Sequence, residues 1–333
     1  MKALITGGAG FMGSFVVKHL LKMGFEVIVI DKLDYSGDIR RIIDLIDKIK
    51  FYKLDLLNFE NLREVLTQEK PEYIIHLASQ THVDRSILFP RDFIENNIIG
   101  TFNLLESVKY LKIKKFIHIS TDEVYGEIEK GEFSEDSSLL PNSPYSFSKA
   151  SSDLLVRSYF KTYNVPSIIL RPTNNYGPFQ YPEKLIPLTI LKALKNERIP
   201  IYGNGKQRRV WLFVEDFIKA IEIIIEKGKI GEIYNIGSDE EYENLEVVMK
   251  ILSKLNKSFD LIEFVPDRPA HDFRYALNYQ KIKNLGFYPK YKLDEGLEIT
   301  INWYLNNLDW LMEKYELTSN FVKNLLKFYE NFI

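Results

Sequence analysis

Two residues spaced one helical turn apart, Tyr145 and Lys149, have the side chains needed for proton transfer. They form the pattern Y-x-x-x-K. Pro144 precedes them and suits the first turn of a helix, so both side chains are expected on one helix face. An unperturbed phenol has a pKa near ~10 and is not a base at neutral pH, but a neighbouring ammonium, together with the positive ring of an oxidised cofactor, lowers that pKa. The pair is therefore a candidate base for removing a proton from a hydroxyl group.

A second polar group, Ile119–Gly126 (I-S-T-D-E-V-Y-G), overlaps the end of the apolar run Lys115–Ser120. The run is expected to be a buried parallel strand, and such sheets bind ligands beyond the carboxyl ends of their strands. The adjacent carboxylates of Asp122 and Glu123 would then lie at a ligand-binding edge. These residues alone leave open the alternative of a turn with solvated acids.

Three glycines, Gly7, Gly10 and Gly13, follow a predicted strand and open a predicted helix at Phe11–Met23. The first glycine permits a tight turn, the second lets the backbone approach a pyrophosphate, and the third allows close packing of helix against strand. The helix N-terminus adds N–H donors and partial positive charge. This context predicts a dinucleotide-binding loop.

An acidic residue, Asp31, follows the apolar run Glu26–Ile30. Its carboxylate would accept both ribose hydroxyls, which favours NAD over NADP because a 2′-phosphate would be repelled. Lys32 beside it could soften that repulsion. Asp55 and Leu56 would border the adenine by the same geometry, although Asp55 could equally cap a helix.

The first half of the chain alternates apolar runs with helical patterns, such as the helix expected at Asn96–Tyr110. The strands are expected at Lys2–Thr6, Glu26–Ile30, Lys50–Leu54, Tyr73–Leu77, Lys115–Ser120 and Ser167–Leu170. Strands this apolar bury both faces, so the pattern predicts an α/β fold with a doubly wound parallel (Rossmann) sheet.

The domain organisation is expected to combine two interleaved parts. Residues 1–178 would form the NAD-binding Rossmann domain, with a return segment at about 211–237 that contains the helix and strand of Val214–Ile236. Residues 179–333 would form mainly a smaller substrate-binding lobe plus the C-terminal helical segment Asp294–Ile333. For that segment, packing on its own chain is favoured over binding a partner.

Composition excludes several classes of protein. The 333 residues contain 44 Lys and Arg against 46 Asp and Glu, which removes the electrostatic case for a nucleic-acid binder. The absence of cysteine excludes disulfides and thiolate metal sites, and no metal site is expected. No apolar run reaches the ~18–20 residues needed to span a bilayer, and the start does not read as a signal peptide, so a cytoplasmic protein is expected.

Taken together, these motifs resemble the extended short-chain dehydrogenase/reductase superfamily. Within it they are similar to the nucleotide-sugar 4,6-dehydratases, and dTDP-glucose is the implied substrate. The resemblance runs from Met1 to about Lys290. Besides the motifs above, it rests on Y-S-F-S-K (Tyr145–Lys149), R-P-T-N-N-Y-G-P (Arg171–Pro178), His76–Ile87, Pro182–Pro187, Trp211–Asp216, Tyr234–Ser238 and Asp267–Asn278.

The resemblance implies a lyase reaction in which NAD is regenerated. Oxidation of C4 of the sugar by Tyr145 and NAD would make the C5 proton acidic, with Thr121 hydrogen-bonded to the C4 oxygen. Glu123 would then be the base at C5, while protonated Asp122 would donate to the departing C6 hydroxyl. Hydride would return to C6, and two carboxyls with opposite roles require separated pKa values. Sister epimerases usually lack this acidic pair.

The resemblance also implies two sets of contact residues. Cofactor contacts are expected from Gly7, Gly10, Phe11, Met12, Gly13, Asp31, Lys32, Asp55, Leu56, Leu77, Ala78, Ser120, Tyr145, Lys149 and Asn174. Contacts to a nucleoside-diphosphate sugar are expected from His82, Asp84, Arg85, Ser86, Asn174, Asn175, Lys184, Arg209, Asn244, Arg268 and His271. One departure is Val210, where relatives usually have an Asp, which leaves open how Arg209 is held.

Alternatives remain at this point. A UDP-sugar 4,6-dehydratase or a nucleotide-sugar 4-epimerase would share the fold, and a non-catalytic NAD-binding regulator would share the glycine loop but typically loses the Tyr or the Lys. The resemblance further implies a homodimer that pairs through helices around Thr101–Tyr110 and Lys149–Tyr163.

Overall fold

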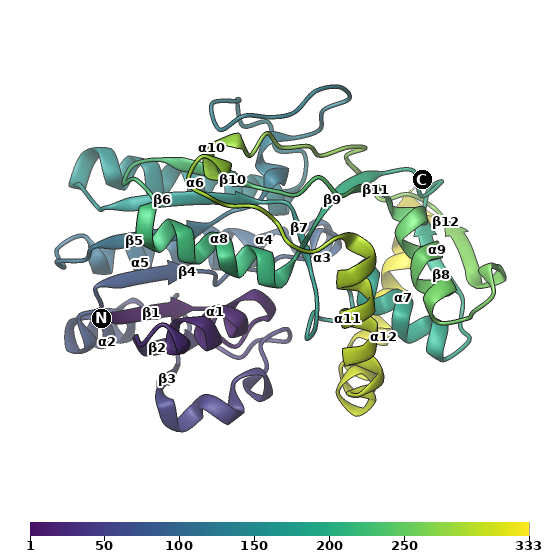
Figure 1. Cartoon of the computed structure of the whole chain (residues 1–333), viewed down its shortest axis with the longest axis horizontal. Coiled ribbons are helices and arrows are strands. Elements are labelled where there is room, and N and C mark those ends of the chain that lie inside the picture. The colour runs from purple at the N-terminus through teal and green to yellow at the C-terminus, as the bar shows by residue number, and fades with distance from the viewer. Residues whose placement is uncertain (333) are drawn as a thin grey trace.

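The larger lobe is built on one parallel sheet (Figure 1). The computed structural model describes residues 1–332. The strand order is β10-β6-β5-β4-β1-β2-β3, and neighbouring strands all run parallel. The strands are β1 (Lys2–Thr6), β2 (Glu26–Asp31), β3 (Ile49–Lys53), β4 (Tyr73–His76), β5 (Lys115–Ile119), β6 (Ser167–Pro172) and β10 (Ile233–Ile236). The predicted doubly wound α/β fold is confirmed.

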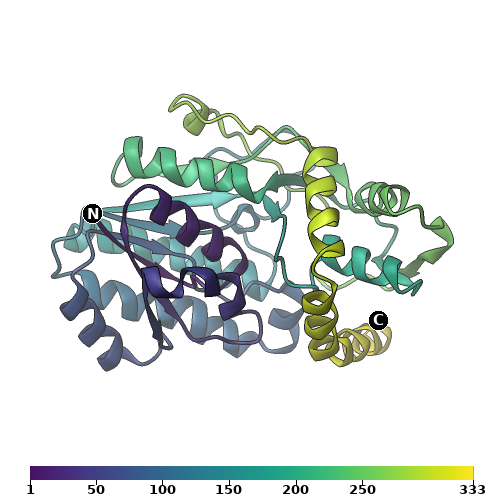
Figure 2. The same ribbon diagram turned by 60° about the horizontal axis from the view of Figure 1, so that its bottom comes forward.

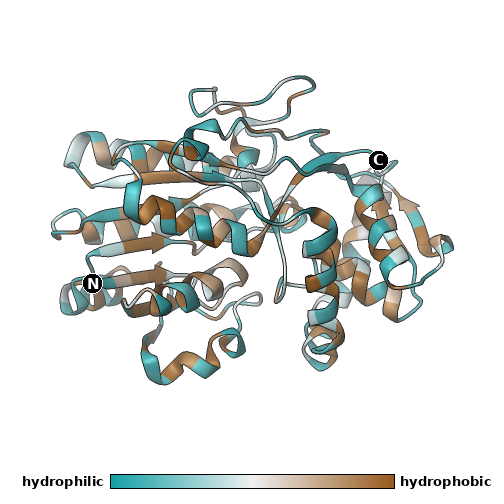
Figure 3. Cartoon of the chain, viewed as in Figure 1, coloured by the Kyte–Doolittle hydropathy of each residue, from teal (hydrophilic) through white to brown (hydrophobic). Residues whose placement is uncertain are grey.

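Helices cover both faces of this sheet (Figures 1 and 2). On one face α1 packs beside α8, and on the other α5 packs beside both α2 and α6. Apolar side chains of these helices meet those of the strands in two cores, visible as brown bands in Figure 3. The helices are α1 (Phe11–Lys22), α2 (Phe59–Glu69), α5 (Gly100–Val108), α6 (Pro144–Tyr163) and α8 (Val214–Lys227).

The helix expected at Asn96–Tyr110 is not continuous. A π-helical turn at Ile94–Ile99 precedes α5. Within this turn the carbonyl of Asn97 accepts hydrogen bonds from the hydroxyls of Thr101 (2.6 Å) and Ser152 (2.7 Å). Wide turns of this kind arise where side chains interrupt the regular helical hydrogen bonds, and they recur at functional sites.

The smaller lobe is built on two short sheets. β9 (Arg208–Phe213) lies between β7 (Asn174–Tyr176) and β11 (Glu241–Glu243), and β8 (Ile199–Tyr202) pairs with β12 (Ile262–Val265). Its helices are α7 (Leu185–Leu194), α9 (Asn244–Lys254), α11 (Leu293–Leu305) and α12 (Leu308–Phe332). Within the expected return segment, α8 and β10 rejoin the large sheet, whereas β9 pairs inside the smaller lobe. The domain boundaries themselves stay a prediction.

Short elements connect these parts. They are α3 (Val83–Leu88), α4 (Pro90–Phe93), α10 (Gln280–Lys283) and the 3-10 helices at Ile39–Arg41, Ile43–Lys48, Asp122–Tyr125 and Phe259–Leu261. Among residues 1–332, no helix is both long and apolar enough to cross a bilayer.

A buried polar network ties α6 to the sheet. Asp153 accepts from Nε of Arg171 at 2.8 Å and lies 3.3 Å from Nε2 of His118. Arg171 also donates to the hydroxyl of Tyr125, which donates to Asn235. Burial alone would raise the pKa of Asp153, but the charge of Arg171 holds that pKa below its usual range. The network therefore holds the helix that carries Tyr145 in its place.

Removing the Asp153 carboxylate should destabilise the fold strongly. In Asp153→Ala the guanidinium of Arg171 would stay buried without its ion-pair partner, which costs about 3–5 kcal/mol. Urea unfolding followed by circular dichroism measures the loss. Glu64→Ala, which removes an exposed acid in α2, should change stability by no more than ~0.5 kcal/mol. Equal stability of the two variants would contradict the role of the network.

Candidate active site

The glycine loop between β1 and α1 leaves no room for side chains. A Cβ on Gly13 would lie 2.1 Å from the carbonyl oxygen of Gly7. Gly7 has a φ of +71°, and a Cβ there would lie 2.8 Å from the backbone nitrogen of Ala78, after β4. The loop therefore lies where the strand order reverses between β1 and β4, the place where doubly wound sheets bind dinucleotides. A cavity lies beside this loop, and Phe11 and Met12, at the start of α1, line it together with the three glycines.

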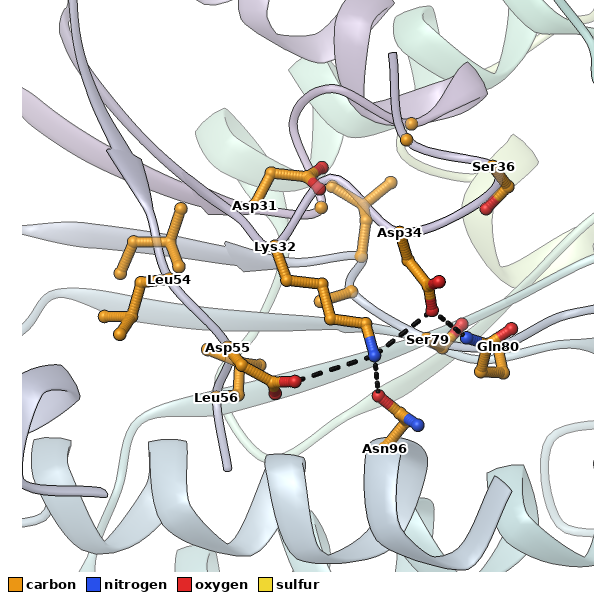
Figure 4. Close-up of a pocket in the computed structure, with 16 residues that line it drawn as sticks. Asp31, Lys32, Asp34, Ser36, Leu54, Asp55, Leu56, Ser79, Gln80 and Asn96 are labelled. Atoms are coloured by element: carbon orange, nitrogen blue, oxygen red, sulfur yellow. Dashed lines mark hydrogen bonds and ion pairs between the residues drawn. The ribbon is translucent and has the colours of Figure 1, made fainter. Parts of the chain in front are cut away.

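The cavity beyond β2 carries the acidic residue expected for a ribose (Figure 4). Asp31 accepts hydrogen bonds from the backbone N–H groups of Ala9 (2.9 Å) and Leu33 (2.8 Å), one on each oxygen. Both contacts fix the orientation of the carboxylate, and each oxygen keeps a second lone pair for a ligand. The wall of this cavity also includes Leu56, Leu77 and Ala78.

Lys32 does not offer a free charge to this cavity. Figure 4 shows its ammonium held between three side chains. It donates to Asn96 at 2.6 Å and pairs with Asp34 at 3.2 Å and Asp55 at 3.6 Å. The lysine is thus neutralised by two carboxylates, and it does not offset the repulsion between Asp31 and a 2′-phosphate.

The Tyr145 and Lys149 pair lies at the start of α6. Ser143 and Ser146 cap this helix reciprocally, with Pro144 in its first turn. Lys149 is buried and donates to the carbonyl of Ile119 at 2.7 Å, and burial lowers its pKa to about 8. Both side chains of the pair line the cavity beside Ser120, at the end of β5.

In the protein alone the pKa of Tyr145 lies above its usual range. Burial, and then the charge of Glu123, raise this pKa, while a hydrogen bond with Thr121 lowers it. The expected lowering depends on Lys149 together with the positive ring of a bound cofactor, and it stays a prediction.

The acidic pair lies beyond β5, where Asp122 is buried and Glu123 is half-buried. Thr121 donates to Asp122 at 3.1 Å and accepts from the backbone N–H of Glu123 at 3.3 Å. The second carboxylate oxygen of Asp122 has no hydrogen-bond partner within residues 1–332. Burial, and then the charge of Glu123, raise the pKa of Asp122 to about 7. Burial also raises the pKa of Glu123, although Arg268 and Arg209 oppose the shift.

A neighbouring cavity between the two lobes gathers most of the residues expected to bind a sugar nucleotide. Its lining includes His82, Asp84, Glu123, Asn174, Asn175, Lys184, Arg209, Asn244, Arg268 and His271. Several buried polar atoms here lack a partner in the described chain. They are Oδ1 of Asn174 and Asn175, Oε1 of Gln207, Nε of Arg268 and Nε1 of Trp211. Buried polar groups are almost always satisfied, so this cluster indicates a polar ligand.

Arg209 is held without the acid that Val210 replaces. Its guanidinium donates to the carbonyls of Arg208 (2.8 Å), Asp272 (2.8 Å) and Phe273 (3.2 Å). It also lies 4.2 Å from the ring centre of Tyr275. Backbone carbonyls and an aromatic ring therefore hold the guanidinium in place of a carboxylate. Because these partners carry no negative charge, the positive charge of Arg209 can attract an anionic ligand.

Two expected substrate contacts, Arg85 and Ser86, do not line the cavities described above. The turn of α3 directs them elsewhere. Ser86 donates to the carbonyl of Val83 at 2.6 Å and is fully buried. Arg85 donates to Glu183 at 2.9 Å. Arg85 therefore reaches the cavity through Glu183, which lines it, and the expected substrate contacts of Arg85 and Ser86 stay predictions.

Sequence reasoning missed several lining residues. They are Gln180, Glu183, Tyr202, Gln207, Tyr275, Val322 and Leu325. Tyr275 could have been found, because it lies within the matching stretch Asp267–Asn278. Val322 and Leu325 lie on α12 and carry no local signal, since an apolar residue on an amphipathic helix is ordinarily core.

Replacing Gly13 should abolish dinucleotide binding. Gly13→Ala would place a methyl group against the carbonyl oxygen of Gly7, so the turn would have to open. We expect purified Gly13→Ala to carry no dinucleotide by absorbance after denaturation and to show no binding of added NAD by calorimetry. Gly100→Ala, whose Cβ would make an ordinary 3.5 Å contact, should bind like the unchanged protein. Normal binding by Gly13→Ala would contradict this site.

Comparison with known proteins agrees with this geometry. The family described as GDP-mannose 4,6 dehydratase matches residues 4–300. The dTDP-glucose 4,6-dehydratase of Neisseria meningitidis serogroup B is 43% identical over 335 residues, covering 93% of this chain and 94% of that protein. The dTDP-glucose 4,6-dehydratase 1 of Escherichia coli K12 is 42% identical, with the same shares of both chains covered.

Solved structures show the same likeness. DesIV, a dTDP-glucose 4,6-dehydratase from Streptomyces venezuelae solved with NAD bound, superposes with a TM-score of 0.90 at 39% identity, covering 93% of this chain and 98% of that chain. The dTDP-glucose 4,6-dehydratase of Bacillus anthracis in complex with NAD gives 0.86 at 43% identity, covering 94% and 99%. The chain therefore belongs to the GDP-mannose 4,6 dehydratase family of the extended short-chain dehydrogenase/reductases.

Proposed function

We propose that this protein is an NAD-dependent dTDP-glucose 4,6-dehydratase, a lyase that forms dTDP-4-keto-6-deoxyglucose. The observation that carries the proposal is the acidic pair beside Tyr145 in one cavity, where Asp122 is buried and Glu123 is half-buried. The named relatives over nearly the whole chain support it. A 4-epimerase needs only the Tyr and Lys pair and has no use for the two acids.

The residues around the glycine loop fit NAD. Gly7, Gly10 and Gly13 leave backbone exposed at the start of α1, and Asp31 would hold the ribose next to them. The pairing of Lys32 with Asp34 and Asp55 favours a ribose without a 2′-phosphate. Bound NAD would accept hydride from C4, return it to C6, and place a positive ring charge near Tyr145.

The chain's own groups would carry the protons. Tyr145 takes the proton of the C4 hydroxyl, and Thr121 donates a hydrogen bond to the C4 oxygen as the ketone forms. The ketone acidifies the C5 proton, which Glu123 removes and later returns to C5. Asp122 donates its proton to the C6 hydroxyl, which leaves as water. The proton that Tyr145 gained balances the one that Asp122 gave, so the net change is loss of one water.

The three cations Lys184, Arg209 and Arg268 would bind the two phosphates. All three line the sugar-nucleotide cavity, and the guanidinium of Arg209 donates to backbone carbonyls, which carry no net charge. Guanidinium groups suit phosphate oxygens because they present several donors in one plane. Asn174 and Asn175, with unpartnered amide oxygens within the described chain, would lie between cofactor and sugar.

We also propose that the protein is a homodimer in the cytoplasm. The dimer would pair through α5 and α6, which expose Phe102, Phe147, Leu154 and Tyr163, together with Tyr110 in the turn after α5. Aromatic and leucine side chains exposed together on two neighbouring helices are typical of a homodimer interface. Light scattering coupled to size exclusion tests the dimer, and a monomer at micromolar concentration would contradict it.

Product analysis tests the proposed reaction and its substrate. The protein is incubated separately with dTDP-glucose and UDP-glucose, and the products are examined by mass spectrometry. We expect loss of one water from dTDP-glucose, with the alkali-induced absorbance of a keto sugar. An isomer of unchanged mass would indicate an epimerase, and turnover of UDP-glucose alone would overturn the assigned nucleobase.

Removing the proposed C5 base should block water loss without preventing binding. Glu123→Gln keeps the shape of the side chain but cannot accept the C5 proton, so kcat should fall by about 10²–10⁴-fold. The dissociation constant for dTDP, measured by calorimetry, should stay within a few-fold of the unchanged protein. Dehydration at the native rate would contradict the role of Glu123.

The pH dependence of kcat/KM should reflect the ionisation of Asp122. Burial, and then Glu123, raise the pKa of Asp122 to about 7, and only the protonated form can donate to the C6 hydroxyl. We therefore expect kcat/KM to fall as the pH rises above about 7. Asp122→Asn should lower kcat/KM by about 10²–10⁴-fold and lose this alkaline limb. The same limb retained in Asp122→Asn would assign it to another group.

A further inference from the structure

The C-terminal helix α12 (Leu308–Phe332) lies outside the part of the chain that the family matches. That match ends at residue 300. Figures 1 and 2 show α11 and α12 at the junction of the two lobes. The helix contacts both lobes at three points along its length, and its last turns reach the sugar-nucleotide cavity.

The first turns of α12 hold the segment that supports the glycine loop. The indole N–H of Trp310 donates to Asp38 at 2.9 Å, and the ammonium of Lys314 lies 3.0 Å from the same carboxylate oxygen. The backbone N–H of Asp38 in turn donates to the carbonyl of Ala9 in the loop. This end of the helix is therefore fixed to the cofactor side of the molecule.

The middle of α12 contacts the segment after β4. The ring of Phe321 lies 3.9 Å from the guanidinium carbon of Arg85, with Tyr35 at the same distance. The ring of Phe321 also meets that of His82 edge-on, 6.0 Å between centres. Arg85 is thus a second point, after Asp38, where the helix contacts the larger lobe.

The last turns of α12 reach the sugar-nucleotide cavity directly. Val322 and Leu325 line it, and Leu325 is almost fully buried. The hydroxyl of Tyr329 donates to Asp84 at 2.8 Å. The same oxygen, Oδ1, lies 3.7 Å from Nη1 of Arg268, while the hydroxyl of Tyr202 donates to the other oxygen at 3.4 Å.

We propose that α12 forms one wall of the substrate site and positions Arg268 for the diphosphate. Val322 and Leu325 supply the apolar wall, which limits the width of the cavity. Tyr329 fixes Asp84, and Asp84 orients Arg268 toward the ligand. This inference rests on the proposed function, because the ligand is taken to be a nucleoside-diphosphate sugar. Tyr329 is a positioning residue, since it acts through Asp84.

The argument for a positioning role comes from charge and burial. Asp84 is buried, and the charge of Arg268 holds its pKa below the usual range although burial alone would raise it. A buried carboxylate needs its hydrogen-bond donors, because the loss of a donor to a buried group costs more free energy than the loss of a donor to an exposed group. Without Tyr329 the carboxylate would turn toward its remaining partners, and the guanidinium would move with it.

Two variants and a matched control test the proposal. Leu325→Trp should fill the cavity and weaken dTDP binding by more than ~10-fold, whereas Tyr329→Phe should weaken it about 5–10-fold through the lost hydrogen bond. Both should raise KM for dTDP-glucose while leaving kcat within ~2-fold and the bound NAD content unchanged. Asn324→Trp, on the exposed face of α12, should match the unchanged protein in every measurement.

The outcomes separate this inference from the proposed function. Calorimetry with dTDP needs no turnover. Equal dTDP affinity in all four proteins would overturn the role of α12 and leave the proposed function intact. Failure of the unchanged protein to bind dTDP would overturn both. Because Leu325→Trp could fail to fold, a thermal melt is recorded, and Tyr329→Phe, which keeps the ring, then decides the question.

Discussion

The proposed chemistry depends on one constraint, the burial of Asp122 beside the half-buried carboxyl group of Glu123 at the carboxyl end of β5. In water both acids would ionise well below neutral pH and could not take opposite roles. Burial, and then the charge of Glu123, raise the pKa of Asp122 to about 7. Burial also raises the pKa of Glu123, but Arg268 and Arg209 oppose that shift. The surroundings of the two acids therefore differ, and the proposed roles use this difference.

The parallel sheet delivers the reactive groups to that place. The carboxyl ends of β1, β4, β5 and β6 meet at one edge, so loops distant in sequence line one cavity. The network of Asp153 and Arg171 fixes α6 against β6, and this fixes Tyr145 and Lys149 opposite the acids. The same contacts that stabilise the core thus set the geometry of the site. The helix α12 connects the larger lobe to the wall of the sugar-nucleotide cavity in the same way.

Local pattern predicted much of the fold and the chemistry. The turn at Gly7–Gly13 and the helical spacing of Tyr145 and Lys149 are short-range features, because backbone sterics and helix periodicity determine them within a few residues. Strand boundaries followed the apolar runs to within a residue or two. The π-helical turn at Ile94–Ile99 escaped prediction, because it depends on hydrogen bonds from Ser152, which is remote in sequence.

The sequence by itself determined the fold class, the dinucleotide loop and the identity of the acids and the phenol, since each is a property of residue type and near spacing. Only the tertiary structure decided what those side chains meet. It paired Lys32 with two acids, paired Arg85 with Glu183 and brought Leu325 into the wall of the sugar-nucleotide cavity. Such contacts join segments far apart in the chain. They depend on the free energy of long-range packing, which cannot be read from the residue types of a short stretch.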